Sequence, residues 1–561
     1  MENRADGAHR EREHFFGAAK SVAGLTVLSR IAGMFRATAI ASLGANALTD
    51  AFSLAFKIPN LFRRLFAEGA LSSAFVPVFT QTSESPDAGP EQAKALLASA
   101  TGILGVFLLV LMFVVQAGLL VWGVFWPGPQ DRQLMILLAW IMLPFMVTIC
   151  LLALGSAALN CRGHFLYPAA APILLNVIII AAAWGVAPLF GGDLPAKLMV
   201  VGVGMTVAGV VQLVGAVRVL RRAGLSLRPR LWPVHPAIRP MLRLMVPMLI
   251  PLGLQQLLQF LESAIAWVLR AQEGAKYINI LGMELPRPLE PGVLQRLDAA
   301  GYLYQFPLGV LAISLGVAVF PLLSRYAARN DIPSLRDALN RALRLALMEG
   351  LATGMGLFLL AEPITWVLYR HGRFTAADVA QSAGILRMYV LGMWALCSYQ
   401  ILVRCFYALK DMITPLKISC VLAAVDLVLV ATLIWVPGLG ARAFGLATTI
   451  TFSVNAIVLV FLLRRRLGRL GGRKLAASVA RSVLACAAMA GAILVLKWVL
   501  GQLVHEEGQR NWVIVGACVP AGAAVFFAAA WALRCPELKE LLGARAARSA
   551  GSPPPDARDP G

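Results

Sequence analysis

The stretch GAAKSVAGLTVLSRIAGMFRATAIASL, residues 17–43, decides the fold, because it is long enough to cross a bilayer. It nevertheless carries Arg30 near its middle and Arg36 six residues later. The next apolar run, residues 51–79, adds four charged side chains: Lys57, Arg63, Arg64 and Glu68. An arginine at mid-membrane depth costs about 2.5–3.5 kcal/mol by insertion scales, and it cannot lose its proton to avoid that cost. Such side chains must face water, a counter-charge or an anionic ligand, and together they predict a hydrated cationic cavity.

The composition is that of an integral membrane protein. Hydrophobic residues make up 59% of the 561 residues, charged residues only 14%, and the mean hydropathy is +0.74. Runs of about twenty apolar residues predict roughly fourteen membrane-spanning helices, so the fold class is an all-α polytopic membrane protein. After the two charged runs, the spans fall near residues 95–125, 132–158, 166–190, 197–220, 241–269, 294–323, 342–368, 380–408, 413–436, 441–463, 477–500 and 511–533.

Arginine-rich connections orient the chain in the membrane. They lie around residues 218–243, 325–344 and 464–481, whereas the intervening connections contain few or no basic residues. All three fall on one side of the predicted bundle, so the positive-inside rule places both termini in the cytoplasm of a plasma (inner) membrane protein. This topology, together with anionic membrane lipid, accounts for the net charge of +21. Nucleic acid is excluded as a partner, because the basic residues flank spans instead of forming one face.

The sequence contains no recognisable catalytic, metal or cofactor motif. Its eight cysteines are scattered, mostly inside apolar runs, and its six histidines fall in tails and loops. There is no His-Glu-x-x-His zinc motif and no phosphate-binding loop of the kind that ATPases use. We therefore expect a membrane protein that is not an enzyme and that needs no cofactor or metal.

The second span concentrates polar side chains along one side. Lys57, Asn60, Arg63 or Arg64, and Glu68 recur at helical spacing. On the first span, Arg30 and Arg36 lie about 9 Å apart along the axis and roughly 120° apart around it, so they can line neighbouring walls of one cavity. Two alternatives stay open. In the first, the Arg36 side chain extends to the membrane interface instead of lining the cavity. In the second, Asp50 caps the second helix instead of serving as a counter-charge to the arginines.

The expected ligand is an anion that carries phosphate, because guanidinium groups bind phosphate oxygens in bidentate pairs. Two carboxylates also fall deep in later spans, Glu262 and Asp426, and Thr449 can add an oxygen. A set of two carboxylates and a hydroxyl suits a monovalent cation, which suggests coupling to an ion gradient. The alternative is structural pairing with buried arginines.

Several blocks of this sequence closely resemble one known family, the MurJ (MviN) lipid II flippases. The blocks are SRIAGMFR at 29–36, TDAF at 49–52, FKIPNLFRRLFAEGA at 56–70, AFVP at 74–77, PILLN at 172–176, FPLGV at 306–310, HGRFT at 371–375 and TPLKI at 414–418. The resemblance covers most of the first twelve predicted spans, and the block Asn60–Gly69 is specific to the family. The family belongs to the multidrug/oligosaccharidyl-lipid/polysaccharide exporter superfamily.

That resemblance implies a fold and an activity. It implies two six-helix lobes around a central cationic cavity, and two C-terminal helices that form a groove for the lipid tail. The activity is translocation of lipid II, the lipid-linked peptidoglycan precursor of cell-wall synthesis, between leaflets by alternating access. We divide the chain accordingly into a cytoplasmic tail at 1–14, a first lobe at 15–222, a basic linker at 223–240, a second lobe at 241–466 with an outer loop at 270–295, a groove at 475–534 and a disordered cytoplasmic tail at 542–561.

The resemblance also assigns site residues. The family's substrate-cavity arginines match Arg30, Arg36 and Arg63, its first-lobe aspartate matches Asp50, its second-lobe acidic position resembles Glu262, and its ion-site helices resemble those of Asp426 and Thr449. We expect Ser29 and Asn60 to bind the diphosphate with the three arginines, and Arg64 and Glu68 to act with Asp50 in gating or orientation. Glu262, Asp426 and Thr449 are the expected ligands for a coupling cation. The chain departs from the family at Tyr302 and Gln305, where the family has an arginine and a glutamate, and at Ala37, where it often has aspartate. Arg296, six residues before Tyr302, is a candidate substitute for the missing arginine. These departures put the identity of the headgroup in question.

Two other functions remain open from sequence. One is a flippase for another polyprenyl-diphosphate-linked glycan, which the changes at Tyr302 and Gln305 favour. The other is a non-transporting scaffold for cell-wall enzymes. A drug exporter is disfavoured, because a cationic drug calls for an acidic or aromatic cavity. The expected partners are lipid II or a related polyprenyl-diphosphate glycolipid, membrane lipid, and cell-wall synthesis proteins.

Overall fold

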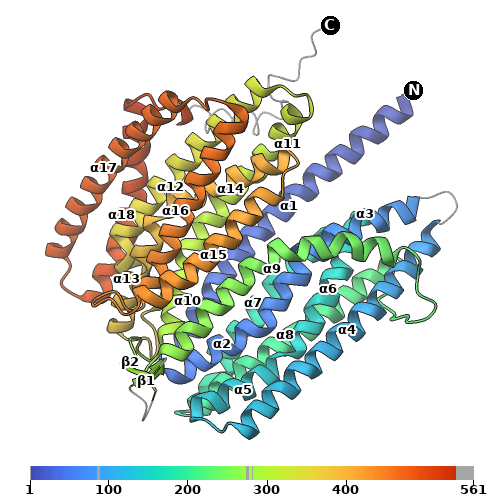
Figure 1. Cartoon of the computed structure of the whole chain (residues 1–561), viewed down its shortest axis with the longest axis horizontal. Helices are drawn as coiled ribbons and strands as arrows, with labels where there is room; N and C mark the ends of the chain where they lie inside the picture. Colours follow the sequence, from blue (N-terminus) through green and yellow to red (C-terminus); the bar gives the residue numbers. More distant parts are fainter. Residues whose placement is uncertain (1, 85–88, 273–276, 281, 539–561) are drawn as a thin grey trace. The chain divides into compact units, whose positions relative to one another are not determined.

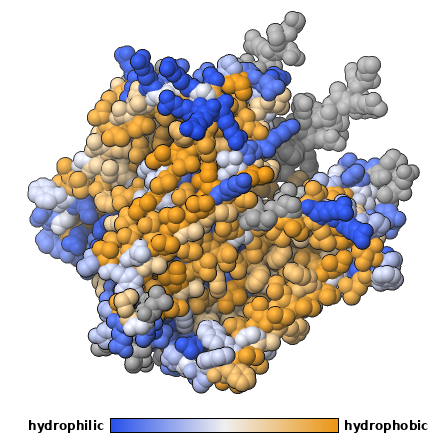
Figure 2. Space-filling model, viewed as in Figure 1, coloured by the Kyte–Doolittle hydropathy of each residue, from blue (hydrophilic) through white to orange (hydrophobic). Residues whose placement is uncertain are grey.

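Almost every element of the protein is a helix (Figure 1). The computed structural model describes residues 2–84, 89–272, 277–280 and 282–538, and the side chains of these except 2–20, 23, 67–70, 72, 73, 247, 248, 250–252 and 280. The prediction of an all-α polytopic membrane protein is confirmed. Hydrophobic residues cover much of the visible face, and hydrophilic residues gather towards the helix ends (Figure 2). The tail expected at 542–561 lies outside the described residues.

The chain divides into two compact units, and unit 1 comprises residues 1–298 and 371–375. Its elements are α1 (Glu2–Ala41), α2 (Ala47–Phe62), η1 (Arg63–Ala70), α3 (Leu71–Glu84), α4 (Gly89–Phe125), α5 (Gln130–Met142), α6 (Pro144–Cys161), α7 (Leu166–Ile180), η2 (Ala181–Val186), η3 (Ala187–Phe190), α8 (Leu194–Arg222), α9 (Ile238–Leu269), β1 (Tyr277–Ile280), β2 (Met283–Pro286) and the first turns of α10 (Val293–Pro307). Because α1 begins at Glu2, residues 2–14, expected as a tail, continue the first helix.

Unit 1 is held together by close helix pairs. α1 packs on α7, α2 on α5 and α9, and α6 on α8. Small residues allow these approaches, as usual in membrane bundles. A side chain at Gly209 of α8 would overlap Phe145 and Thr148 of α6. Between α2 and α3, the wider π-helical turn of η1 re-aims the chain just where Arg63 and Arg64 occur.

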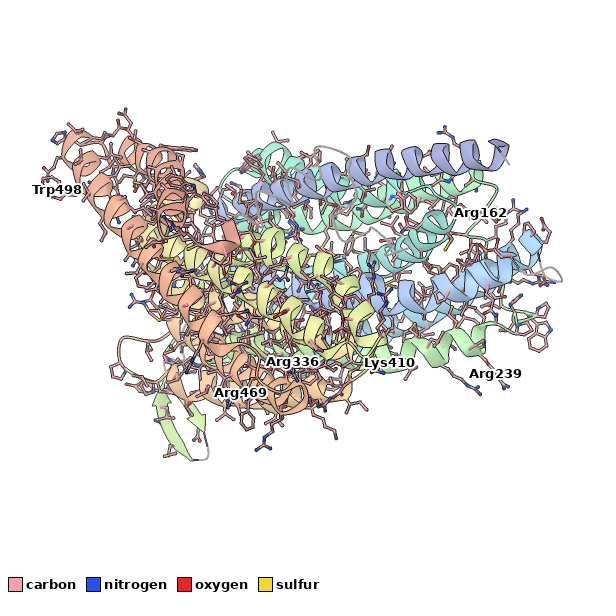
Figure 3. All side chains as sticks on the ribbon, turned by 90° about the horizontal axis from the view of Figure 1, so that it is seen from above. Arg162, Arg239, Arg336, Lys410, Arg469 and Trp498 are labelled. Atoms are coloured by element: carbon pink, nitrogen blue, oxygen red, sulfur yellow. The ribbon has the colours of Figure 1, made fainter. Side chains whose placement is uncertain are left out.

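Unit 2 comprises residues 299–370 and 376–561. After the end of α10 its elements are η4 (Leu308–Ala312), α11 (Ile313–Ala328), α12 (Ile332–Tyr369), α13 (Ala376–Leu391), α14 (Met393–Ala408), α15 (Ile413–Leu433), α16 (Arg442–Leu467), α17 (Gly472–Leu503) and α18 (Glu507–Ala532). α12 packs on α13, α14 and α17, and a Cβ at Gly350 of α12 would lie 2.7 Å from the Trp394 Cα of α14. α17 and α18 pack on each other, and Trp498 projects from α17 with 68% of its surface exposed (Figure 3). A lipid-tail groove between these two helices stays a prediction.

The expected count of about fourteen spans is not confirmed. Within the described residues, ten helices are long and apolar enough to cross a membrane, or eleven if α13 and α14, which meet at a 45° bend, form one span. Helices also occupy the predicted first, second and seventh spans, as α1, α2 with α3, and α9. These are outside the ten, and they are the helices that carry Arg30, Lys57 and Glu262.

The boundary between the units differs from the predicted lobe boundary. We expected the second lobe to begin at residue 241, whereas α9 and the β1–β2 hairpin belong to unit 1, whose main segment ends at Asp298 within α10. The physical reason is a ladder of polar contacts between α9 and the α2–η1 segment. Arg64 donates to Gln256 Oε1 at 3.0 Å and to Gln259 Oε1 at 2.9 Å, and these bonds tie α9 to the N-terminal helices.

Candidate functional site

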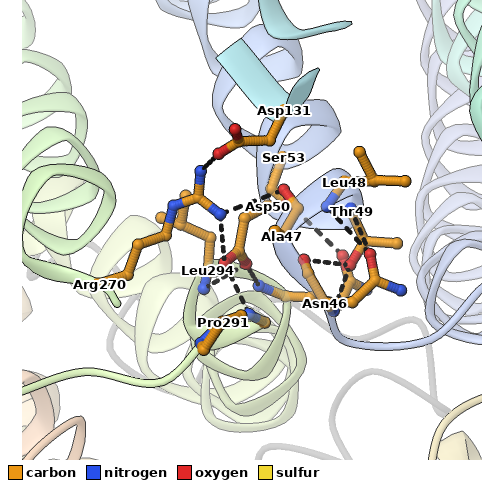
Figure 4. Close-up of polar contacts among 12 residues, drawn as sticks. Asn46, Ala47, Leu48, Thr49, Asp50, Ser53, Asp131, Arg270, Pro291 and Leu294 are labelled. Carbon is orange, nitrogen blue, oxygen red and sulfur yellow. Dashed lines mark hydrogen bonds and ion pairs between the residues drawn. The ribbon is translucent and has the colours of Figure 1, made fainter. Parts of the chain in front are cut away.

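The turn between α1 and α2 places Asp50 at the start of α10. Asn46 caps α2, because its side-chain oxygen accepts from the Leu48 and Thr49 amides at 3.0 and 3.1 Å while the Thr49 hydroxyl accepts from the Asn46 amide at 2.9 Å. Asp50 is therefore free of the capping role that we left open for it. Its carboxylate, fully buried, instead accepts backbone N–H groups from Gly292 at 2.7 Å and Leu294 at 2.9 Å (Figure 4).

A buried arginine completes this contact. Arg270, at the end of α9, has no exposed surface and lies between two carboxylates, Asp50 at 3.6 Å and Asp131 of α5. It also donates to the Ala47 carbonyl at 3.3 Å and lies 3.7 Å from the centre of the Trp267 ring. This buried cluster thus joins α2, α5, α9 and the N-terminus of α10 through Asp50, Arg270 and Asp131. The N-terminus of α10 stabilises the Asp50 carboxylate, because helix N-termini attract negative charge.

The sequence analysis missed Arg270 and Asp131. Each occurs at the end of an apolar run, where a charged side chain is ordinarily explained by proximity to the membrane interface. Only the pairing across 139 positions of sequence identifies them as a buried pair. The one available signal was that Arg270 begins the long connection 270–295. In the structure, this connection contains the β1–β2 hairpin, and Arg287 donates to the Arg270 carbonyl at 3.1 Å.

The predicted diphosphate ligands all lie in unit 1 and are partly buried. On α1, the Ser29 carbonyl accepts from Asn176 Nδ2 of α7 at 3.1 Å, and the Arg36 guanidinium lies 5.6 Å from the centre of the Phe56 ring of α2. Arg63 Nε donates to Asn60 Oδ1 at 2.7 Å. The structure therefore brings Asn60 and Arg63 together as predicted, and Arg36 lies against the Phe56 ring of α2.

Lys57 forms a contact that the sequence did not predict. Its ammonium lies 2.8 Å from Asp298 Oδ1 on α10 and 2.9 Å from Ser263 Oγ on α9. The helical stack of Lys57, Asn60 and Arg63 is thus present, but its first member is already paired with a carboxylate. The side chain of Glu68, the fourth member of the predicted stack, lies outside the described residues.

Arg296, the candidate substitute for the family arginine missing at Tyr302, lies next to the turn that precedes α10. Its guanidinium donates to the Pro291 carbonyl at 3.1 Å and lies 3.5 Å from Glu290 Oε2, both in the turn that precedes α10. Positions 296 and 302 are six residues apart, about 120° around the helix, so they lie on different sides of α10. Tyr302 is half-buried and Gln305 is exposed.

The candidate cation ligands fall on separate elements. Glu262 is half-buried on α9 in unit 1, and Asp426 is buried on α15 in unit 2. The hydroxyl that reaches Asp426 is that of Thr451, at 2.9 Å, while Thr449 donates to the Met388 carbonyl of α13 at 2.6 Å. Thr449 and Thr451 are two residues apart on α16, about 160° around the helix, so they lie on different sides of it. Within the described part of the chain, no three His, Cys, Asp or Glu side chains gather as a metal site requires.

Comparison with known proteins gives consistent matches over most of the chain. Residues 40–506 match the family model described as "Lipid II flippase MurJ". A probable lipid II flippase MurJ of Rhizobium tropici is 31% identical over 525 residues, 91% of this chain and 93% of that protein. The lipid II flippase MurJ of Burkholderia cenocepacia is 32% identical over 460 residues, 81% of this chain and 84% of that protein.

Solved structures show the same fold. A structure of lipid II flippase MurJ in an inward closed conformation matches with a TM-score of 0.70 at 21% identity, over 91% of this chain and 97% of that one. An inward-facing multidrug transporter of the MATE family, in the MOP superfamily, matches with a TM-score of 0.63 at 14% identity, over 81% of this chain and 98% of that one. At these identities the likeness concerns the fold alone.

Proposed function

This chain belongs to the MurJ family of lipid II flippases, and from that premise we propose that it moves lipid II from the inner to the outer leaflet by alternating access. It is a multi-pass inner-membrane protein and a transporter, not an enzyme. The proposed cargo couples a polar headgroup and a diphosphate to a long polyprenyl tail. Because water is a prohibitive environment for the tail, only the headgroup and diphosphate would cross through a polar site.

The observation that carries the proposal is the partial burial of three arginines in the helices of unit 1. Arg30, Arg36 and Arg63 are each half-buried, neither fully exposed nor sealed in the core. A guanidinium held in partly dry surroundings attracts phosphate oxygens more strongly than one in bulk water. We assign diphosphate binding to these three residues, with Ser29 and Asn60 beside them, and assign Asp50, Arg64 and Glu68 to gating or orientation.

Asp50 supports a gating role through its partners. It holds the first turn of α10, the helix that continues from unit 1 into unit 2. A motion of unit 2 against unit 1 would act on that helix directly. Cargo would shift such a motion only by binding one state more tightly than the other.

Coupling to a monovalent cation is a further part of the proposal, assigned to Glu262, Asp426 and Thr449. Asp426 is 2% exposed, and we add Thr451 because its hydroxyl contacts that carboxylate. We also propose that both termini face the cytoplasm, on the strength of the arginine-rich connections. Cell-wall synthesis proteins are the expected protein partners.

A flippase for another polyprenyl-diphosphate-linked glycan is the second candidate, favoured by Tyr302 and Gln305. The two share the diphosphate and differ in the headgroup. Measuring transport of lipid II and of a lipid with a different sugar headgroup by the same protein distinguishes the two candidates. A non-transporting scaffold is distinguished by tolerance of alanine at Arg30 and Arg36.

Complementation tests the proposal. In cells depleted of their own flippase, Arg63→Ala should abolish rescue while the protein still accumulates in the membrane. Arg239→Ala is the matched control, because Arg239 lies exposed near the start of α9 (Figure 3) and loses the same charge. Normal growth with Arg63→Ala, Arg30→Ala and Arg36→Ala would refute diphosphate binding by these residues.

A further inference from the structure

The ion pair between Lys57 and Asp298 occupies an unusual place in unit 1. Lys57 is on α2, one helical turn before Asn60, which accepts from Arg63. Its ammonium contacts oxygens from two other helices, Asp298 Oδ1 on α10 at 2.8 Å and Ser263 Oγ on α9 at 2.9 Å. A lysine in the row of proposed diphosphate ligands therefore already holds an anion that belongs to the chain itself.

This pair is built differently from the buried pair nearby. The side chains of Lys57 and Asp298 are 23% and 26% exposed, whereas that of Arg270 is 0% exposed and lies between two carboxylates. An ion pair with this exposure contributes little net stability, because water competes for both partners. Lysine also presents a compact charge on a flexible stem, without the rigid fork that fixes arginine to one partner. The Lys57–Asp298 contact is thus one that a stronger anion can replace.

We propose that Asp298 is a displaceable internal anion, which occupies Lys57 until the diphosphate of the cargo takes its place. The proposal rests on the proposed function and deepens it, since it names Lys57 as a further diphosphate ligand and Asp298 as its competitor. A diphosphate carries more negative charge and more acceptor oxygens than a carboxylate, so it is the better partner for an ammonium that also has Asn60 and Arg63 nearby. Ser263 holds the lysine in position during the exchange.

The exchange acts on the helix that joins the two units. Along one face of α2, Asp50 holds the amides at the start of α10, Ser53 donates to Gln295 at 3.1 Å, and Lys57 holds Asp298. Asp298 is the residue of α10 at which the main segment of unit 1 ends. When the diphosphate replaces it on Lys57, the contact of α2 furthest along α10 is released, while the contacts of Asp50 and Gln295 remain. Cargo binding is thereby linked to the freedom of α10.

Equilibrium binding of undecaprenyl diphosphate to the purified full-length protein in nanodiscs tests this exchange. Asp298→Asn removes the competing charge and keeps the shape, so it should tighten binding, by about tenfold for a coupling of ordinary size. Lys57→Gln should weaken binding. In the Lys57→Gln background, Asp298→Asn should have no further effect, because the competition no longer exists. Undecaprenyl monophosphate should gain less than the diphosphate from Asp298→Asn.

The sign of the Asp298→Asn effect separates the exchange from a structural role. If the ion pair only holds α2 to α10, both single variants should weaken binding and lower the unfolding temperature together, and that result would overturn the proposal. Glu362→Gln is the control, because Glu362 pairs with Arg387 at 3.4 Å in unit 2 and loses the same charge. Equal tightening by this control would overturn the proposal as a general charge effect. Failure of the unaltered protein to bind undecaprenyl diphosphate would refute the proposed function as well, whereas binding unaffected by Asp298→Asn would refute the exchange alone.

Discussion

Replacing Arg270 by methionine should strongly destabilise the protein. Arg270 has no exposed surface, and its removal leaves the buried carboxylates of Asp50 and Asp131 without their shared cation. Breaking a buried ion pair by removing one partner costs about 3–5 kcal/mol. The side chain also gives up its hydrogen bond to the Ala47 carbonyl and its position 3.7 Å from the Trp267 ring. The methionine offsets part of this loss by packing, so we expect a net destabilisation of about 4 kcal/mol.

A set of related variants makes this prediction specific. Asp131→Asn keeps the Arg270–Asp50 contact and should cost less, about 1–3 kcal/mol. The triple variant Arg270→Met, Asp131→Asn, Asp50→Asn leaves no buried charge and should recover much of the stability lost in Arg270→Met. Unfolding of the purified protein in mixed micelles, followed by tryptophan fluorescence, measures all of these. The reasoning is refuted if Arg270→Met unfolds within about 1 kcal/mol of the unaltered protein, or if the triple variant is no more stable than the single one.

Two further predictions concern contacts within each unit. Glu537, fully buried after α18, accepts from Arg344 at 2.9 Å, so Glu537→Ala should cost about 3–5 kcal/mol in the same unfolding assay, and an unchanged stability would contradict the structure. Gly372 has a φ of +59° and no room for a side chain beside the Ser42 carbonyl, whereas Gly163 has a φ of +75° and open space. Gly372→Ala should therefore lower the unfolding temperature more than Gly163→Ala, which bears only the backbone strain, and equal shifts would show that the close approach to Ser42 is not needed.

Much of the fold could be predicted because a bilayer leaves few solutions. Long apolar runs must become helices, which satisfy their own backbone groups. The runs that fall outside the ten long apolar helices are informative in their own right, since α1, α2 and α9 carry charges to which we assign roles in transport. The unit boundary could not be predicted, because it depends on the packing of α9 against α2, η1 and α3, which includes the Arg64 bonds to Gln256 and Gln259, and hydropathy does not report such packing.

The site was partly predictable for the same reason. Charged residues inside an apolar run can be identified from the sequence, as Arg30, Arg36 and Arg63 were. Asn60 contacts Arg63, as their spacing of three residues on a helix predicts. Charged residues at the ends of apolar runs are common and are not distinctive in sequence, so Arg270 was not identified as a site residue. The sequence also does not show which of two nearby polar residues caps a helix. Asn46 and Asp50 are both suitable caps for α2, and the structure shows that Asn46 is the cap.

The central claim is that the protein carries lipid II across the membrane. It is tested most directly by measuring how much lipid II becomes accessible at the outer leaflet of flippase-depleted cells that express this protein. We expect outer-leaflet lipid II to be restored by the unaltered chain and to stay at the depleted level with Arg63→Ala. If the unaltered chain leaves lipid II inaccessible, or if the Arg63→Ala variant restores it fully, the account is wrong.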